Sequence, residues 1–220
     1  MKKVWTLPSI ALLAFAGLGA GYEAGPTSPE AAAETASNPP EPVAWNVDKP
    51  HTEINFSVKH FFTPVTGTFR DYEVEFWFDE ADPTNSSVKV TVDVASIDTR
   101  NERRDNHLRS ADFFDAANHP QMTFESTSVR MAGENEMVAT GDLTIKGITR
   151  EVELPISLLG IRELPSEMQE MMGGITHVAG FDAETQLDRR EFEVGVANWA
   201  QTVIVGGEVD VKIHVEANRR

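Results

Sequence analysis

The sequence predicts an all-β domain folded as an antiparallel barrel of about eight strands. Apolar and polar residues alternate over several long stretches, and turn signals rich in Gly, Pro and Asp separate these stretches. A period of two with one polar face is typical of antiparallel strands that cover a single interior. The length of 220 residues suits one such domain together with a leader.

Four segments show the alternation most clearly. Between Tyr72 and Phe78 the apolar and aromatic residues fall on one face, whereas Glu73 and Glu75 fall on the other. The other clear strands are 88–94, 152–158 and 209–215, and weaker strands are expected at 54–59, 121–130, 136–146 and 177–188. Closing these strands into a ring would leave no exposed edge, so a barrel is favoured over an open sheet.

Two segments interrupt the strand pattern. The run from Asn101 to Ser110 is dense in charge and compatible with helix, with Thr99 as a candidate N-cap and Glu102 three residues later. We predict a short helical crossover here. The segment from Leu164 to Gly174 contains three methionines, and we expect a second helical turn or a lid.

The start of the chain is expected to lie outside the barrel. Lys2 and Lys3 precede an apolar run and then small residues, which is the pattern of a secretory signal peptide. This run is shorter than the ~20 apolar residues of a membrane-spanning helix. We predict a signal peptide at 1–21, a disordered tether rich in Pro, Ala and Glu at 22–43, and the barrel at 44–220. The protein is therefore expected to be periplasmic or secreted.

Composition argues against several classes of function. A net charge of −16 repels phosphate backbones, so we expect no nucleic-acid partner. The chain has no cysteine, which removes disulfides, thiolate metal sites and thiol nucleophiles. Its six histidines are scattered without H-x-H or HExxH spacing, so neither a metal site nor a cofactor is expected.

Motifs of the common enzyme classes are missing from the sequence. There is no Gly-x-Ser-x-Gly elbow, no Gly-rich phosphate loop and no dinucleotide fingerprint. Asp98, Asp105, His107 and Ser110 could be imagined as a hydrolytic set, but nothing in their spacing orients them. We therefore predict that the protein is not an enzyme and name no catalytic residues.

The barrel interior permits two interpretations at this point. Seven phenylalanines on expected strands and turns are candidates for the interior, among them Phe69 and Phe192. An eight-stranded barrel can be filled by such side chains or can enclose one small ligand. The alternation of residues does not distinguish a solid core from a cavity.

Several ordered strings of residues resemble a known family. They are Trp45–His60, Gly67–Arg70, Ser96–Asp115, His119–Thr127, Gly141–Thr149 and Gly180–Phe181. Together they resemble the YceI-like domain over essentially the whole expected barrel, from about Trp45 to Glu216. One place departs from the family pattern: Arg-x-[Asp/Glu]-[Phe/Tyr]-Gly is usual near the last hairpin, and here Phe192 is followed by Glu193.

The resemblance implies a lipocalin-like barrel, extended in shape, that is exported and often dimeric. Members of the family bind polyprenyl chains or related long amphiphiles in an interior tunnel. The expected function is therefore non-enzymatic binding, with transport or storage, of a long-chain isoprenoid or acyl lipid. A homodimer and a transient membrane contact are the further partner expectations. The alternatives are a protein-interaction barrel of the cell envelope without bound lipid and, third, a hydrolase.

We expect the ligand-binding residues to come from the inward strand faces and from the crossover. The predicted tunnel residues are Phe56, Phe76, Phe78, Phe124, Phe181, Val90 and Val92. Near one end of the tunnel, Arg103, Arg104 and His107 could contact a polar lipid head. The alternative for Arg104 is structural, because a network with Asp105 would fix the crossover onto the barrel.

Overall fold

The computed structural model describes residues 42–201 and 203–220. The expected signal peptide and nearly all of the expected tether lie outside the described residues. The strands are β1 (Val43–Val47), β2 (Glu53–His60), β3 (Thr63–Phe69), β4 (Tyr72–Phe78), β5 (Ser87–Asp93), β6 (Ile97–Asp98), β7 (Gln121–Met131), β8 (Glu136–Ile145), β9 (Ile148–Glu163), β10 (His177–Asp188) and β11 (Val205–Arg219). The α-helices are α1 (Glu102–Arg109) and α2 (Ser166–Met171), and neither is long and apolar enough to cross a membrane.

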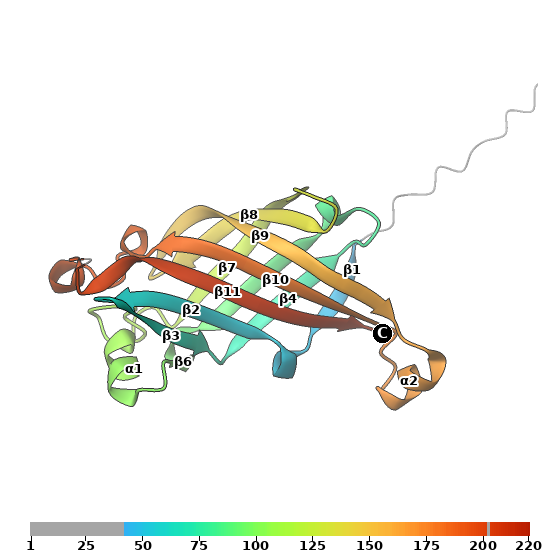
Figure 1. Ribbon diagram of the computed structural model, residues 1–220, viewed down its shortest axis with the longest axis horizontal. Helices are drawn as coiled ribbons and strands as arrows, with labels where there is room; N and C mark the ends of the chain where they lie inside the picture. The colour runs from blue at the N-terminus through green and yellow to red at the C-terminus, as the bar shows by residue number, and fades with distance from the viewer. Residues whose placement is uncertain (1–41, 202) are drawn as a thin grey trace, which may run out of the picture. The chain divides into compact units, whose positions relative to one another are not determined.

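Eight strands form a closed antiparallel ring, as the alternation predicts. The order is β1-β4-β5-β7-β8-β9-β10-β11, and β1 closes the ring by pairing with β11. Strands β2, β3 and β6 extend the sheet from the other half of β11 (Figure 1). The expected number of strands in the barrel is confirmed, although β1, which is absent from the predicted set, takes the ring position that β2 was expected to hold.

Both irregular segments contain helices. The predicted crossover is α1, but its N-cap is Asn101, whose side chain accepts a hydrogen bond from the backbone N–H of Arg104 at 3.0 Å. The expected N-cap Thr99 is wrong, because its hydroxyl and backbone N–H are already bound by Asp105. The methionine-rich segment contains α2, which lies at the opposite end of the barrel from α1 (Figure 1).

The interior divides into apolar clusters along the barrel axis. At the end near α2, Trp45, Phe78, Met137 and Phe181 pack into one cluster, which we call the filled end. Toward α1, one cluster forms around Ile97, and another, around Phe192, belongs to the loops that close that end. Inward residues of β2, β5 and β11 belong to the cluster around Ile97 or pack against it, and they also line the cavity described next.

Candidate ligand-binding cavity

A cavity of about 220 Å³ lies inside the barrel toward α1. Only apolar surface of its walls faces the space. Lining residues come from strands β2, β3, β5 and β7 to β11, from α1 and the turn after it, and from the loop before β11. We call this region the cavity end. A space of this kind excludes water and accepts apolar groups, because nothing in it can hydrogen-bond a polar one.

Four of the predicted tunnel residues line this cavity. They are Phe56 on β2, Val90 and Val92 on β5, and Phe124 on β7. The two phenylalanine rings lie against glycines: a Cβ added to Gly67 would lie 2.4 Å from the Phe56 ring. A Cβ added to Gly141 would likewise lie 2.7 Å from the Phe124 ring. The missing side chains let both rings lie close to the wall, which leaves the space open.

The other three predicted tunnel residues pack at the filled end. The ring of Phe181 meets those of Phe76 and Phe78 edge to face, with centroids 5.2 Å apart in each pair. Trp45 packs on Phe78 in the same manner at 6.2 Å. These rings are in mutual contact and do not line the cavity, so the structure brings together only part of the predicted tunnel.

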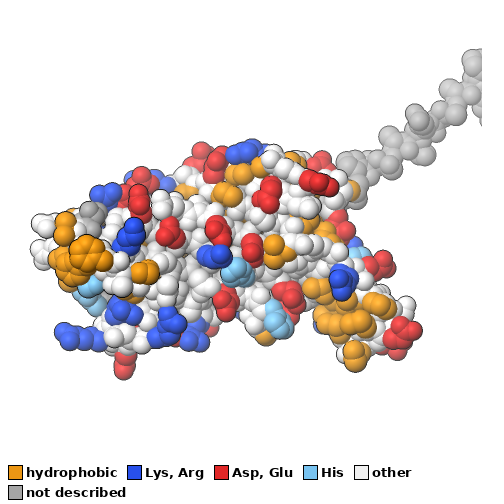
Figure 2. All heavy atoms as spheres, viewed as in Figure 1, with side chains coloured by type: hydrophobic (Ala, Val, Ile, Leu, Met, Phe, Trp, Pro, Cys, Tyr) orange, Lys and Arg blue, Asp and Glu red, His pale blue; other side chains and the backbone are white. Residues whose placement is uncertain are grey.

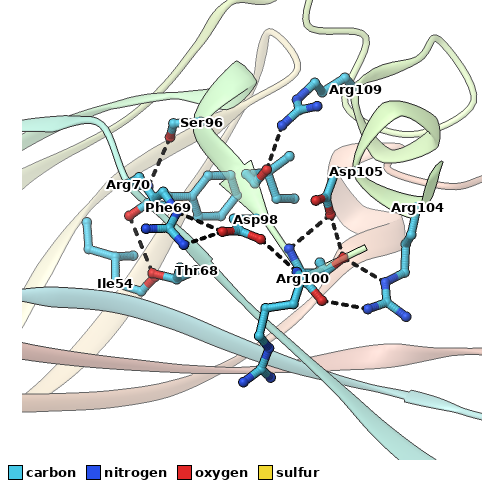
Figure 3. A network of polar contacts seen from close by, with 12 residues as sticks. Ile54, Thr68, Phe69, Arg70, Ser96, Asp98, Arg100, Arg104, Asp105 and Arg109 are labelled. Atoms are coloured by element: carbon cyan, nitrogen blue, oxygen red, sulfur yellow. Dashed lines mark hydrogen bonds and ion pairs between the residues drawn. The ribbon is translucent and has the colours of Figure 1, made fainter. Parts of the chain in front are cut away.

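The three predicted head-group residues lie on α1, and two of them are engaged. Arg104 donates to the hydroxyl and the carbonyl oxygen of Thr99, both at 2.7 Å, and Asp105 also binds Thr99 (Figure 3). This network ties α1 to β6, as the structural alternative for Arg104 requires. The imidazole of His107 contacts Asp112 at 3.1 Å. Arg103 is exposed.

A buried arginine, Arg189, organises the loop that closes the cavity end. It begins the Arg-x-Glu-Phe string compared with the family pattern above, but it was not among the expected site residues. Arg189 is 6% exposed and lines the cavity with its carbon atoms. Its guanidinium donates to carbonyl oxygens of Val194, Gly195, Trp199, Val205 and Gly206. Burial lowers the pKa of Arg189, but arginine stays charged at any ordinary pH. The five carbonyls therefore act as a neutral cage for a cation and hold the loop in place.

Glu193 stands in this loop where the family pattern has glycine. Its backbone is left-handed, with φ 53°, a conformation that glycine adopts without steric cost. The backbone N–H of Glu193 donates to the carbonyl oxygen of Arg190, and the carbonyl oxygen of Glu193 accepts from Lys146 Nζ at 2.9 Å. The turn thus keeps the conformation that the family's glycine favours, with a different residue.

The imagined hydrolytic set does not converge. Asp98 pairs with Arg70 and accepts from the backbone N–H of Arg100, and these contacts lower its pKa, the backbone contact most (Figure 3). Asp105 is bound to Thr99. The Ser110 hydroxyl donates to the carbonyl oxygen of His107 at 2.7 Å, so it is not directed at an imidazole nitrogen. Each group serves a separate structural contact.

Two other features lie away from the cavity. On the outer face of β2, β3, β10 and β11 there is a hollow lined mostly by polar and charged residues, in which Lys212 pairs with Glu184 and Arg70 pairs with Asp98. Separately, Asp48, His51 and Glu216 bring potential metal-ligand atoms within 4.8 Å. The Asp48 carboxylate hydrogen-bonds the exposed His51 ring and raises its pKa. Glu216 is far from Asp48 and His51 in the sequence, so residue spacing could not indicate this group.

A closed barrel with an apolar internal cavity defines a ligand-binding barrel. Within that class, residues 45–217 match the model of the YceI-like domain, and the chain belongs to this family. It is 40% identical over 153 residues to protein YceI of Escherichia coli O157:H7, covering 68% of this chain and 75% of that protein. It is 39% identical over 145 residues to a UPF0312 protein of Ectopseudomonas mendocina, covering 66% and 72%.

Solved structures show the same fold. The crystal structure of Burkholderia cenocepacia BcnA has a TM-score of 0.69 and 30% identity, covering 78% of this chain and 99% of that one. A polyisoprenoid-binding domain from Saccharophagus degradans, implicated in plant cell wall breakdown, has a TM-score of 0.56 and 13% identity, covering 81% and 99%. The second likeness concerns the fold alone.

Proposed function

We propose that this protein binds an apolar, chain-shaped ligand in the cavity end of its barrel, without catalysis, in the periplasm or outside the cell. The observation that carries the proposal is the cavity of about 220 Å³ whose walls present only apolar surface to the space. The fold shared with a polyisoprenoid-binding domain supports an isoprenoid or long acyl chain as the ligand class.

The energetics suit reversible carriage. Burial of roughly 300 Å² of hydrocarbon at about 25 cal/mol per Å² contributes about 7.5 kcal/mol before ordering costs. A membrane offers the chain a similar apolar environment, so the ligand can leave the protein for a bilayer. Storage and transport are both compatible with this balance.

The filled end limits how far a ligand chain can reach. Phe76, Phe78 and Phe181 occupy the interior beyond the cavity. A short chain fits without rearrangement, whereas a long one has to displace these rings or leave its remainder outside the loops. Affinity measured across a series of prenols of increasing length should therefore rise with each added unit and then level off.

Substitution at Phe124 tests the site. After removal of bound lipid, wild-type protein should take up a prenol or a fluorescent fatty acid, and Phe124→Arg should abolish uptake because an unpaired guanidinium is costly in an apolar space. Phe124→Leu keeps the cavity apolar and should retain uptake. Ser128→Arg adds the same charge at an exposed position of the same strand and serves as the matched control.

Mass spectrometry of the organic extract from natively purified protein identifies the ligand. A delipidated wild-type barrel that takes up neither prenols nor fatty acids would contradict the proposal and favour an envelope interaction module.

A further inference from the structure

Exposed apolar side chains gather at the cavity end, on the hairpin between β2 and β3 and on the loop before β11. Phe61 is 52% exposed, Phe62 97% and Val203 72%. The two segments are joined because the backbone N–H of Phe61 donates to the carbonyl oxygen of Ile204 at 2.8 Å. Figure 2 shows the hydrophobic spheres at this end of the molecule. We call Phe61, Phe62 and Val203 the apolar tip.

The charge around the apolar tip differs from that of the rest of the chain. No Asp or Glu occurs from Ile54 to Arg70, and no charged residue of either sign occurs from Val194 to Gly207. The whole chain carries a net charge of −16. The charged residue nearest to the tip in the sequence is Lys59, two residues from Phe61, and the His60 ring lies 4.9 Å from the Phe61 ring. The acidic remainder of the chain repels an anionic surface, whereas the region around the apolar tip does not.

The backbone at Phe61 is strained. Its φ is 52°, in the left-handed region that glycine adopts freely and that aromatic residues rarely adopt. Glycine or asparagine would satisfy the turn at lower cost. An exposed aromatic in such a position contributes little to the interior, so a contact outside the barrel accounts for it better than the fold does.

The apolar tip adjoins the cavity. Val58, on the strand that leads to the hairpin, lines the cavity, and so does Val205, which follows Ile204. The same two chain segments therefore carry the cavity wall on one side and the tip at their ends. A surface that holds the tip would lie next to the place where a ligand chain enters or leaves.

We propose that the apolar tip docks the barrel reversibly on a lipid bilayer, with its three side chains in the boundary between headgroups and acyl chains and Lys59 among the phosphates. Interfacial binding of this kind combines apolar insertion with attraction to anionic lipids. The proposal of docking depends only on the exposed side chains of the apolar tip. Transfer of a ligand at the docked site rests in addition on the function proposed above.

A second copy of the chain fits the apolar tip less well. Three side chains bury a few hundred Å² at most, whereas a stable protein interface buries about 800 Å² on each partner. The small area and the neighbouring Lys59 suit a weak contact with a fluid anionic surface.

The opposite end of the barrel supplies a matched control. Leu159 is 65% exposed and Met171 on α2 is 76% exposed, so the apolar area there is comparable. Acids outnumber cations in this segment, since Glu163, Glu167 and Glu170 accompany one cation, Arg162. Apolar exposure in a surround of net negative charge should not hold the protein on an anionic bilayer.

The test is co-sedimentation with vesicles, using the protein in the processed form that its host produces. Wild type should sediment with vesicles of phosphatidylethanolamine and phosphatidylglycerol, and Phe62→Ser with Val203→Ser should reduce the bound fraction roughly tenfold. Leu159→Ser with Met171→Ser should bind like wild type. Lys59→Gln should weaken binding to these vesicles about fivefold and leave binding to pure phosphatidylcholine unchanged.

Two further measurements separate the possible failures. Sedimentation equilibrium reports self-association: a wild-type dimer that Phe62→Ser dissociates would overturn the proposal in favour of a second copy. Equal vesicle binding by wild type and the tip variant would also overturn it. Uptake of a soluble fluorescent fatty acid without vesicles reports the cavity alone, so its absence would count against the proposed function and not against docking.

Discussion

At the filled end of the barrel, Trp45, Phe78 and Phe181 occupy the interior, whereas at the cavity end a space remains between aliphatic side chains and phenylalanine rings. Both ends use strands with the same alternation of apolar and polar residues. The placement of the aromatic rings differs. The rings of Phe76 and Phe78 contact that of Phe181 at the filled end, whereas the rings of Phe56 and Phe124 lie against Gly67 and Gly141 at the cavity end. Ring contacts and glycine placement thus determine whether a barrel is hollow, and hydrophobic pattern alone does not.

Truncation of one phenylalanine at each end should separate the two regions most strongly. Phe181→Ala removes a ring that contacts two others and should lower the free energy of unfolding by about 3–5 kcal/mol. Phe56→Ala should cost less, about 2 kcal/mol, because that ring already borders a cavity. Urea unfolding measures both values. Equal losses would mean that the cavity end is packed as tightly as the filled end.

Removal of the buried arginine should loosen the cavity end selectively. Arg189→Met leaves five carbonyl oxygens without their donor and should cost about 3 kcal/mol. Hydrogen exchange should become faster over residues 194–206, while amides of β1 and of β10 near Phe181 keep their protection. Unchanged exchange in the loop would show that apolar packing, and not the guanidinium, holds it.

Filling the cavity from its wall should weaken ligand binding without a large loss of stability. An added Cβ at Gly67 would meet only side chains, namely the Phe56 ring and Thr99 Cγ2. Gly67→Ala should therefore push the Phe56 ring toward the cavity and reduce affinity for a bound chain about tenfold. Calorimetric titration measures the affinity. Gly133→Ala, in the turn between β7 and β8, is the matched control.

Acid should weaken both ends through carboxylates with lowered pKa. At the cavity end, the Arg100 backbone N–H and the Arg70 guanidinium lower the pKa of Asp98. After β4, the Asn85 amide and two backbone N–H groups lower the pKa of Asp79. Their contribution to stability is fully present above the ordinary carboxyl pKa near 4 and is lost as pH falls through the lower folded values. Asp98→Asn should have a lower melting temperature than wild type at pH 7, and the difference should shrink toward pH 2.

The smallest expected effect is a gain at the left-handed turn of the cavity end. Glu193→Gly relieves a side chain at φ 53° but adds freedom to the unfolded chain. The net change should be a stabilisation of about 0.5 kcal/mol, which thermal unfolding detects as a rise of about 1–2 °C. A loss of stability would show that the Glu193 side chain has a role that its backbone does not explain.

Alternation in the sequence was enough to predict the barrel and most of its strands. It did not reveal β1, because five residues next to Pro42 are too few to show a period. It selected Phe56, Phe124, Val90 and Val92, since they lie on regular strands. Periodicity could not select Phe113 or Arg189, because they line the cavity from turns whose conformation depends on contacts distant in the sequence.

The division of the interior was equally beyond the sequence. Phe76 and Phe124 occupy equivalent inward positions on strands, yet only Phe124 reaches the cavity. Some rings lie against a glycine and others contact further rings. The register between strands that are far apart in the chain decides between these two arrangements. The YceI-like motifs added the fold and the ligand class, but not this partition.

The pairing of β11 has a consequence for the order in which the protein can fold. Its last residues close the ring on β1, where Val47 pairs with Ala217. These partners are separated by nearly the whole domain, and contacts of such high sequence separation form slowly. Trp45 and Ala217 belong to the same filled end, so that end assembles only after the final strand has been synthesised. Local hairpins such as β8–β9 can form earlier. The barrel, however, cannot close until β11 is available to pair with β1, so the chain stays incompletely folded until then.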